Sequence, residues 1–246
     1  MTQASAGDAY LGGKLSLRQG EGYRAALDAI LLAASLQVKP GDHAAEFGCN
    51  AGAALLSAAA LHHDARFTGV ERDPGAARLA AENIAANAMQ GRVSLVEGDA
   101  LSWRPESQLD AVFFNPPFFD DPASLRAPAP SRRHAWINED GLEAWIAAGL
   151  KRLREGGRLT VIQRADRLGD ILRALDGKAG GAAILPVHPR AGAPAKRVIV
   201  TAIKVSKAPL RLLPGLVLHE AGTGAYMPEA DAILRGEALT ALADPS

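Results

Sequence analysis

Short apolar runs alternate with longer segments of helical periodicity along most of the chain. The apolar runs are bounded by turn residues and predict strands at 43–47, 66–71, 92–97, 109–114, 158–163, 182–187 and 197–204. Segments whose apolar residues recur every three or four positions predict helices at 23–36, from about 53 to 62, and at 75–88, 141–153 and 166–175. This alternation is typical of an α/β fold with a mostly parallel sheet, in which the last two strands form an antiparallel hairpin.

The two ends of the chain carry weaker patterns. Residues 1–10 are small and polar, and 12–22 predict a short hairpin or loop. The C-terminal part holds one apolar run at 210–218 and a short helix near 229–234. We recognise no internal repeat, and therefore predict one domain over 1–246, with an N-terminal loop and helix (1–40), a core (41–206) and a C-terminal extension (207–246).

The composition is that of an ordinary globular protein. Its 246 residues include one cysteine, Cys49, which excludes an internal disulfide and fits a reducing compartment. There is no charged-then-apolar leader and no apolar run of membrane-spanning length. We expect a cytoplasmic protein with no membrane partner. The oligomeric state stays open, with a monomer favoured.

The formal net charge is zero, which disfavours indiscriminate nucleic-acid binding. The charges are nevertheless uneven, because residues 120–212 hold 17 Lys and Arg against 9 Asp and Glu. One interpretation is that arginines solvate helix faces. The other is that one side of the molecule faces an anion.

Polar residues follow the ends of four successive predicted strands. Gly48-Cys49-Asn50-Ala51-Gly52 comes after the first, in the strand, glycine turn and helix arrangement that lets a backbone approach a nucleotide-like ligand. Asn50 stands where a glycine is common, and asparagine tolerates a left-handed conformation. Glu71 ends the second strand, about 20 residues on, where an acid typically binds ribose hydroxyls. Asp99 follows the third strand, within reach of an adenine edge.

The fourth strand delivers Asn115-Pro116-Pro117-Phe118. Two prolines fix two φ angles and extend Asn115, so the segment forms a rigid arch at the carboxyl end of a strand. The Asn115 carbonyl and a neighbouring backbone carbonyl would accept the hydrogens of an exocyclic amine, while Phe118 stacks on a planar group. This pattern favours methylation of a planar nitrogen. A plain Pro-Pro turn is the alternative.

A dinucleotide oxidoreductase also needs a glycine turn and a ribose acid. It would not need the Asn-Pro-Pro-Phe arch, and the glycine turn here lacks the full GxGxxG pattern.

Two basic stretches follow the arch. The first, with Arg132, Arg133, His134 and Trp136, suits phosphate contact and base stacking, although Trp136 fits packing onto the sheet equally well. The second is the connector HPRAGAPAK with Arg190, Lys196 and then Arg197.

The order of glycine turn, ribose acid, adenine acid and arch resembles the Rossmann-like S-adenosylmethionine methyltransferases, in their amino-methylating branch. The flanking segments GGKLSLRQGEGYRAALDAILLAA, HPRAGAPAKRVIV and YMPEADAILRG resemble the bacterial tRNA adenine-N6 methyltransferases that modify the adenine beside the anticodon of a valine tRNA. The resemblance covers about residues 12–239. It implies a seven-stranded, mostly parallel sheet with an antiparallel last strand and helices on both faces.

The resemblance also implies roles for single residues, with S-adenosyl-L-methionine as cofactor, no metal, and tRNA as partner. The implied catalytic set is Asn115, Pro116, Pro117 and Phe118. The implied cofactor-binding set is Tyr23, Arg24, Asp28, Glu46, Gly48, Asn50, Gly52, Glu71, Arg72, Asp99, Ala100 and Asn115. The candidate RNA contacts are Arg132, Arg133, His134, Arg190, Lys196 and Arg197. Two positions depart from the wider pattern, since Glu46 replaces an aspartate and Asn50 a glycine.

Three functions fit these observations. The first is N6 methylation of adenine in tRNA. The second is methylation of another planar amine, such as guanine N2 in ribosomal RNA or a glutamine amide in a protein. The third is cofactor or RNA binding without turnover.

Overall fold

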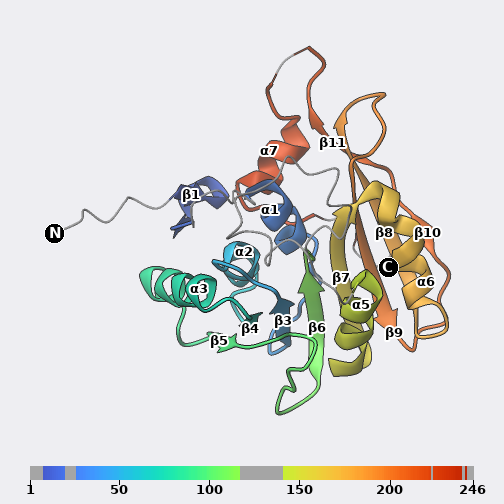
Figure 1. Ribbon diagram of the computed structural model, residues 1–246. Helices are drawn as coiled ribbons and strands as arrows, with labels where there is room; N and C mark the ends of the chain where they lie inside the picture. Colours follow the sequence, from blue (N-terminus) through green and yellow to red (C-terminus); the bar gives the residue numbers. More distant parts are fainter. Residues whose placement is uncertain (1–7, 20–25, 117–140, 223, 240–241, 243–246) are drawn as a thin grey trace, which may run out of the picture.

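The computed structural model describes residues 8–19, 26–116, 141–222, 224–239 and 242. At the centre of this part lies one twisted sheet (Figure 1), with seven longer strands and two short ones at an edge. The longer strands are β3 (His43–Phe47), β4 (Arg66–Glu71), β5 (Val93–Glu97), β6 (Leu109–Phe114), β7 (Leu153–Arg164), β8 (Ala179–Arg190) and β9 (Arg197–Lys204). The short strands are β10 (Arg211–Leu212) and β11 (Leu216–His219).

The strand order is β5-β4-β3-β6-β7-β9-β8, and strands β3 to β7 are mutually parallel. The last long strand, β9, is antiparallel to both of its neighbours. The predicted α/β class, with a mostly parallel sheet and an antiparallel last strand, is therefore confirmed. The additions β10 and β11 pair with β8 and were not predicted.

Helices cover both faces of the sheet because successive strand residues point to opposite sides. Phe113 belongs to one core cluster and Phe114 to the other. The first cluster packs under α1, α2 and α7, and the second under α5 and α6. The helices are α1 (Ala26–Ala34), α2 (Ala53–Leu61), α3 (Pro74–Ala86), α5 (Gly141–Arg152), α6 (Leu168–Leu175) and α7 (Pro228–Leu234), with short 3-10 turns η1 (Leu11–Gly13) and η3 (Ala165–Arg167).

The N-terminal segment forms a small hairpin of β1 (Asp8–Tyr10) and β2 (Leu15–Leu17). It begins earlier than the hairpin or loop predicted at 12–22, because β1 lies in the stretch 1–10, for which the sequence predicted no strand. In the C-terminal extension, β11 pairs with β8 and α7 packs on α1. These contacts tie the extension to the core, and the single domain over 1–246 stays a prediction.

The largest differences in strand bounds are at β7 and β8, and β8 extends beyond the predicted 182–187 at both ends. The Glu-Gly-Gly segment predicted a loop before a strand at 158, but β7 begins at Leu153, directly after α5. Leu153 pairs with Leu109, and the register shifts before Arg158 pairs with Ala111. The glycines thus lie in an irregular strand start, where the positive φ of Gly156 is accommodated. Among the described residues, no helix combines the length and apolar character needed to cross a bilayer.

Candidate active site

The turn between β3 and α2 is built on left-handed backbone conformations. Gly48 has φ +66°, Asn50 +48° and Gly52 +85°. Asn50 thus adopts the conformation that the sequence predicted for it. Its Oδ1 accepts a hydrogen bond from the Ala51 amide at 2.7 Å, which closes the turn locally.

Close packing explains why two positions around this turn are glycine. A Cβ on Gly48 would lie 2.9 Å from Cη2 of Trp145, which comes from α5 on the other face of the sheet. A Cβ on Gly69 of β4 would lie 2.7 Å from Sγ of Cys49. The turn is therefore held between two elements and has little freedom to shift.

Glu71, the predicted ribose acid, is 8% exposed and joins β4 to the turn. One carboxylate oxygen accepts the Asn50 amide and the other the Asp73 amide, each at 2.8 Å. A carboxylate has about four acceptor positions, so about two remain for a ligand's hydroxyl groups. Arg72, beside it, is exposed.

Asp99, the predicted adenine acid, is exposed and caps the turn after β5. Its Oδ1 accepts the Leu101 amide at 3.1 Å and its Oδ2 the Ser102 amide at 3.2 Å. The neighbouring Ala100 is buried. Asp99 and Glu71 end adjacent parallel strands, so both lie at the same edge of the sheet as the glycine turn.

A pocket opens at this edge, and it brings together the turn and the arch. The space between its lining atoms is about 470 Å³ when the part that is open to solvent is included. The register Phe47↔Phe114 between β3 and β6 explains this, because the residues that follow are Gly48 and Asn115. The lining residues are Gln19, Ala29, Glu46, Gly48, Cys49, Asn50, Ala51, Ala53, Ala54 and Asn115.

Glu46 is the acidic residue of this lining and is only 4% exposed. Burial raises the pKa of its carboxyl well above the ordinary 4.5. A hydrogen bond from the Leu55 amide lowers that pKa, and the nearby Glu71 raises it. Its Oε2 is buried and has no hydrogen-bond partner. An orphaned acceptor in a pocket fits a cationic or N–H-bearing ligand group.

Sequence reasoning missed the residue that connects this pocket to the N-terminal hairpin. Asn83 of α3 is 1% exposed, and its amide donates to the carbonyls of Arg18 and Ala51, both at 2.8 Å. Its Oδ1 accepts the Arg18 amide at 2.9 Å. These bonds bring Gln19 beside the glycine turn. A lone Asn in an alanine-rich helix was the available signal.

Asp28 of α1 pairs with Arg197 at the start of β9, and its predicted contact with a cofactor stays a prediction. Its Oδ2 lies 3.0 Å from Arg197 Nε. Ala29, the next residue on α1, lines the pocket. Arg197, a predicted RNA contact, is thus already held by a carboxylate.

The other sequence candidates divide into two groups. Pro116 is buried directly after Asn115, and Arg190 and Lys196 lie at the tip of the β8–β9 hairpin. Those that fall outside the described residues are Tyr23, Arg24, Pro117, Phe118, Arg132, Arg133 and His134.

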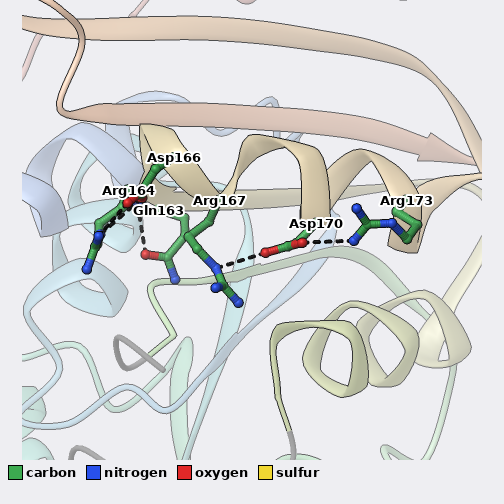
Figure 2. A network of polar contacts seen from close by, with 6 residues as sticks. All are labelled: Gln163, Arg164, Asp166, Arg167, Asp170 and Arg173. Carbon is green, nitrogen blue, oxygen red and sulfur yellow. Dashed lines mark hydrogen bonds and ion pairs between the residues drawn. The ribbon is translucent and has the colours of Figure 1, made fainter. Parts of the chain in front are cut away.

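Several arginines of the stretch 120–212 pair with aspartates in α6 or just before it. Figure 2 shows Arg164 pairing with Asp166, while Asp170 lies between Arg167 and Arg173 at 2.9 and 2.8 Å. Aspartates neutralise much of this stretch, which supports the interpretation that part of the arginine surplus solvates a helix face.

Comparison with known proteins gives a consistent result. The family model described as methyltransferase small domain matches residues 26–179. A protein named tRNA1(Val) (adenine(37)-N6)-methyltransferase from Porphyromonas gingivalis is 34% identical over 158 residues, which are 60% of this chain and 61% of that protein. One of the same name from Aeromonas salmonicida is 30% identical over 202 residues, covering 81% of this chain and 83% of the relative.

Among solved structures, the protein Atu636 of Agrobacterium tumefaciens, described as a predicted O-methyltransferase, superposes with a TM-score of 0.70. It is 29% identical, and the match covers 85% of this chain and 96% of that one. The chain spans about three fifths of the length of the Porphyromonas relative, so the match does not extend over that whole protein.

Proposed function

The chain belongs to the methyltransferase small domain family of S-adenosylmethionine-dependent methyltransferases, and we propose that it methylates the N6 amine of an adenine in tRNA. The observation that carries this proposal is that Asn115 and the glycine turn line one pocket. The names of the relatives support tRNA as the substrate class. A cytoplasmic location follows from such a substrate.

The pocket residues fit the cofactor. S-adenosylmethionine, when bound, supplies an electrophilic methyl group and carries a methionine ammonium and ribose hydroxyls. The unpartnered Oε2 of Glu46 suits the ammonium, and the remaining acceptor positions of Glu71 suit the hydroxyls. The backbone of Gly48 and Asn50 would lie along the ligand, with Asp99 and Ala100 at the adenine end.

Asn115 suits an amine acceptor. Its side-chain carbonyl accepts one hydrogen of the exocyclic nitrogen, which orients the nitrogen lone pair. The following Pro116 is buried, so the arch is anchored where it leaves β6. Proximity and orientation then supply most of the rate enhancement, because the amine attacks without the help of an acid or base of shifted pKa. The amine loses its proton to water.

A hydroxyl acceptor is the second candidate, favoured by the description of the Atu636 protein as a predicted O-methyltransferase. Ribose 2′-hydroxyl groups would be the RNA version of such an acceptor. They need a general base, and the pocket's acid, Glu46, has a raised pKa.

The test is transfer of labelled methyl to tRNA from a bacterium that lacks its own anticodon-adjacent adenine methylation, followed by nucleoside analysis. We expect label in N6-methyladenosine. Label in a 2′-O-methyl nucleoside would favour the second candidate. Label in another base would keep the enzyme class and contradict the N6 assignment.

A further inference from the structure

Two hairpins extend beyond the edge at which the pocket opens (Figure 1). Phe114 of β6 pairs with Val161 of β7, Val161 pairs with Val200 of β9, and Val200 pairs with Ile184 of β8. These four residues therefore lie at one level across the sheet. Arg190 lies six residues past Ile184 on β8, which at about 3.3 Å per residue is roughly 20 Å beyond that level. His219, the last residue of β11, pairs with Arg190 and reaches the same height.

Two stacked aromatic side chains lie on the second hairpin, in which β11 is followed by a turn back to Tyr226. The rings of His219 and Tyr226 stack at 4.6 Å between centroids with a 26° interplanar angle. Their backbones form an isolated antiparallel bridge, and the Met227 amide donates to the Leu218 carbonyl at 2.8 Å. The Nδ1 atom of His219 is buried without a hydrogen-bond partner, so stacking and the backbone hold this ring.

The Tyr226 residue is partly exposed to solvent. It is 38% exposed, and the other large exposed hydrophobic residues of the described surface, Val205, Leu210 and Leu212, are aliphatic. A half-open ring on a fixed partner is a surface on which another flat group can stack.

We propose that His219 and Tyr226 form a platform on which an unpaired base of the RNA substrate stacks. Stacking on aromatic side chains is the usual way in which proteins hold bases of single-stranded RNA loops. Arg190 and Lys196, on the adjoining hairpin, supply the positive charge that the RNA backbone needs.

The platform lies away from the pocket. From β6 to β11 there are four strand-to-strand steps, which at about 4.8 Å each give roughly 19 Å across the sheet. The stacked base is therefore not the methylated one. The platform fixes the position of a loop of the RNA. This inference rests on the proposed RNA function.

The test compares RNA affinity among variants that keep or remove the aromatic face. The probe is an unmodified transcript of a bacterial valine tRNA, titrated with the full chain. Tyr226→Leu keeps apolar bulk and should weaken binding about 10-fold to 100-fold. Tyr226→Phe should bind within about threefold of the parent, and Leu212→Ala, an exposed apolar control on the same sheet, should leave affinity unchanged.

Two further readouts separate stacking from a structural role. In Tyr226→Leu, the salt dependence of binding and the affinity for S-adenosylhomocysteine should stay as in the parent chain. Equal affinities for Tyr226→Leu and Tyr226→Phe would overturn the platform while leaving an RNA methyltransferase in place. Absence of RNA binding by the parent chain would overturn the proposed function, and the platform with it.

Discussion

At the scale of single residues, Glu46 carries the largest electrostatic cost in the described site. It is buried, one oxygen lacks a partner, and its pKa is raised by burial. A carboxyl whose folded pKa exceeds its unfolded pKa contributes stability below the unfolded value and loses it as the pH rises through the folded value. The ligand-free protein is therefore expected to lose stability above about pH 4.5 through this group.

Glu46→Gln removes that titration. We expect the variant to be more stable than the parent in the absence of ligand, by about 1–3 kcal/mol near pH 8, with the difference shrinking toward pH 5. Urea unfolding at several pH values measures it. Cofactor affinity should fall in the same variant, because the neutral amide cannot pair with the methionine ammonium. A stability difference independent of pH would contradict this account.

We propose that the Asn115 side chain contacts the methyl acceptor and contributes little to cofactor affinity. Asn115→Ala should lower the methyl-transfer rate about 100-fold or more, by analogy with the loss of one positioned polar group in other active sites. The affinity for S-adenosylhomocysteine, measured by calorimetry, should stay nearly unchanged. An equal loss of both would show that the amide binds cofactor instead.

At the scale of elements, the glycine turn is the most constrained connection near the pocket. Gly48 combines a positive φ with a close approach to Trp145, so any Cβ is both strained and crowded. Gly48→Ala should lower the free energy of unfolding by about 1–3 kcal/mol and weaken cofactor binding.

Gly169 offers a matched control for this substitution. It lies in α6, and a Cβ there would meet nothing within 4 Å. Gly169→Ala should be neutral or stabilising, since alanine favours helix. Equal destabilisation of the two variants in urea titrations would show that the turn at Gly48 is not specially constrained.

The sequence predicted those elements whose pattern is local. Strands at 43–47, 66–71, 109–114 and 197–204 have the predicted bounds because their apolar runs end at turn residues. The early start of β7 and the short β10 and β11 were missed, because they depend on pairing with strands distant in the chain. Pro214 also interrupts the apolar run that holds β10 and β11.

The site divides in the same way. The glycine turn and Asn115 directly follow strands, and Glu71 is the last residue of one. The topology alone therefore puts them at one edge of the sheet. The hydrogen bond from Asn83 to Ala51 and the ion pair of Asp28 with Arg197 join residues more than 30 positions apart. Nothing in the local sequence specifies such partners.

At the scale of the whole molecule, basic residues of the stretch 120–212 lie both along α6 and on the β8–β9 hairpin. Arg167 and Arg173 share Asp170 on α6 (Figure 2), whereas Arg190 and Lys196 lie on a hairpin that extends past the pocket. The double substitution Arg190→Gln and Lys196→Gln should weaken tRNA binding. It should also reduce the slope of log affinity against log salt by about 1.4, if each residue contacts one phosphate.

The control is Arg167→Gln with Arg173→Gln, which removes the same formal charge. Because the hairpin, and not α6, is the proposed RNA contact, we expect a smaller change in slope. Identical slopes for the two double variants, measured by filter binding, would mean that RNA senses the net charge and not the hairpin.

The central claim is that the N6 amine of adenine accepts the methyl group. It is tested most directly with an RNA in which an oxygen replaces that amine. A valine tRNA anticodon stem-loop is prepared with adenosine beside the anticodon, and a second with inosine, in which an oxygen replaces the N6 amine. Single-turnover transfer of labelled methyl should occur to the first and be absent with the second. Transfer to the inosine-containing RNA would contradict an N6 acceptor held by Asn115.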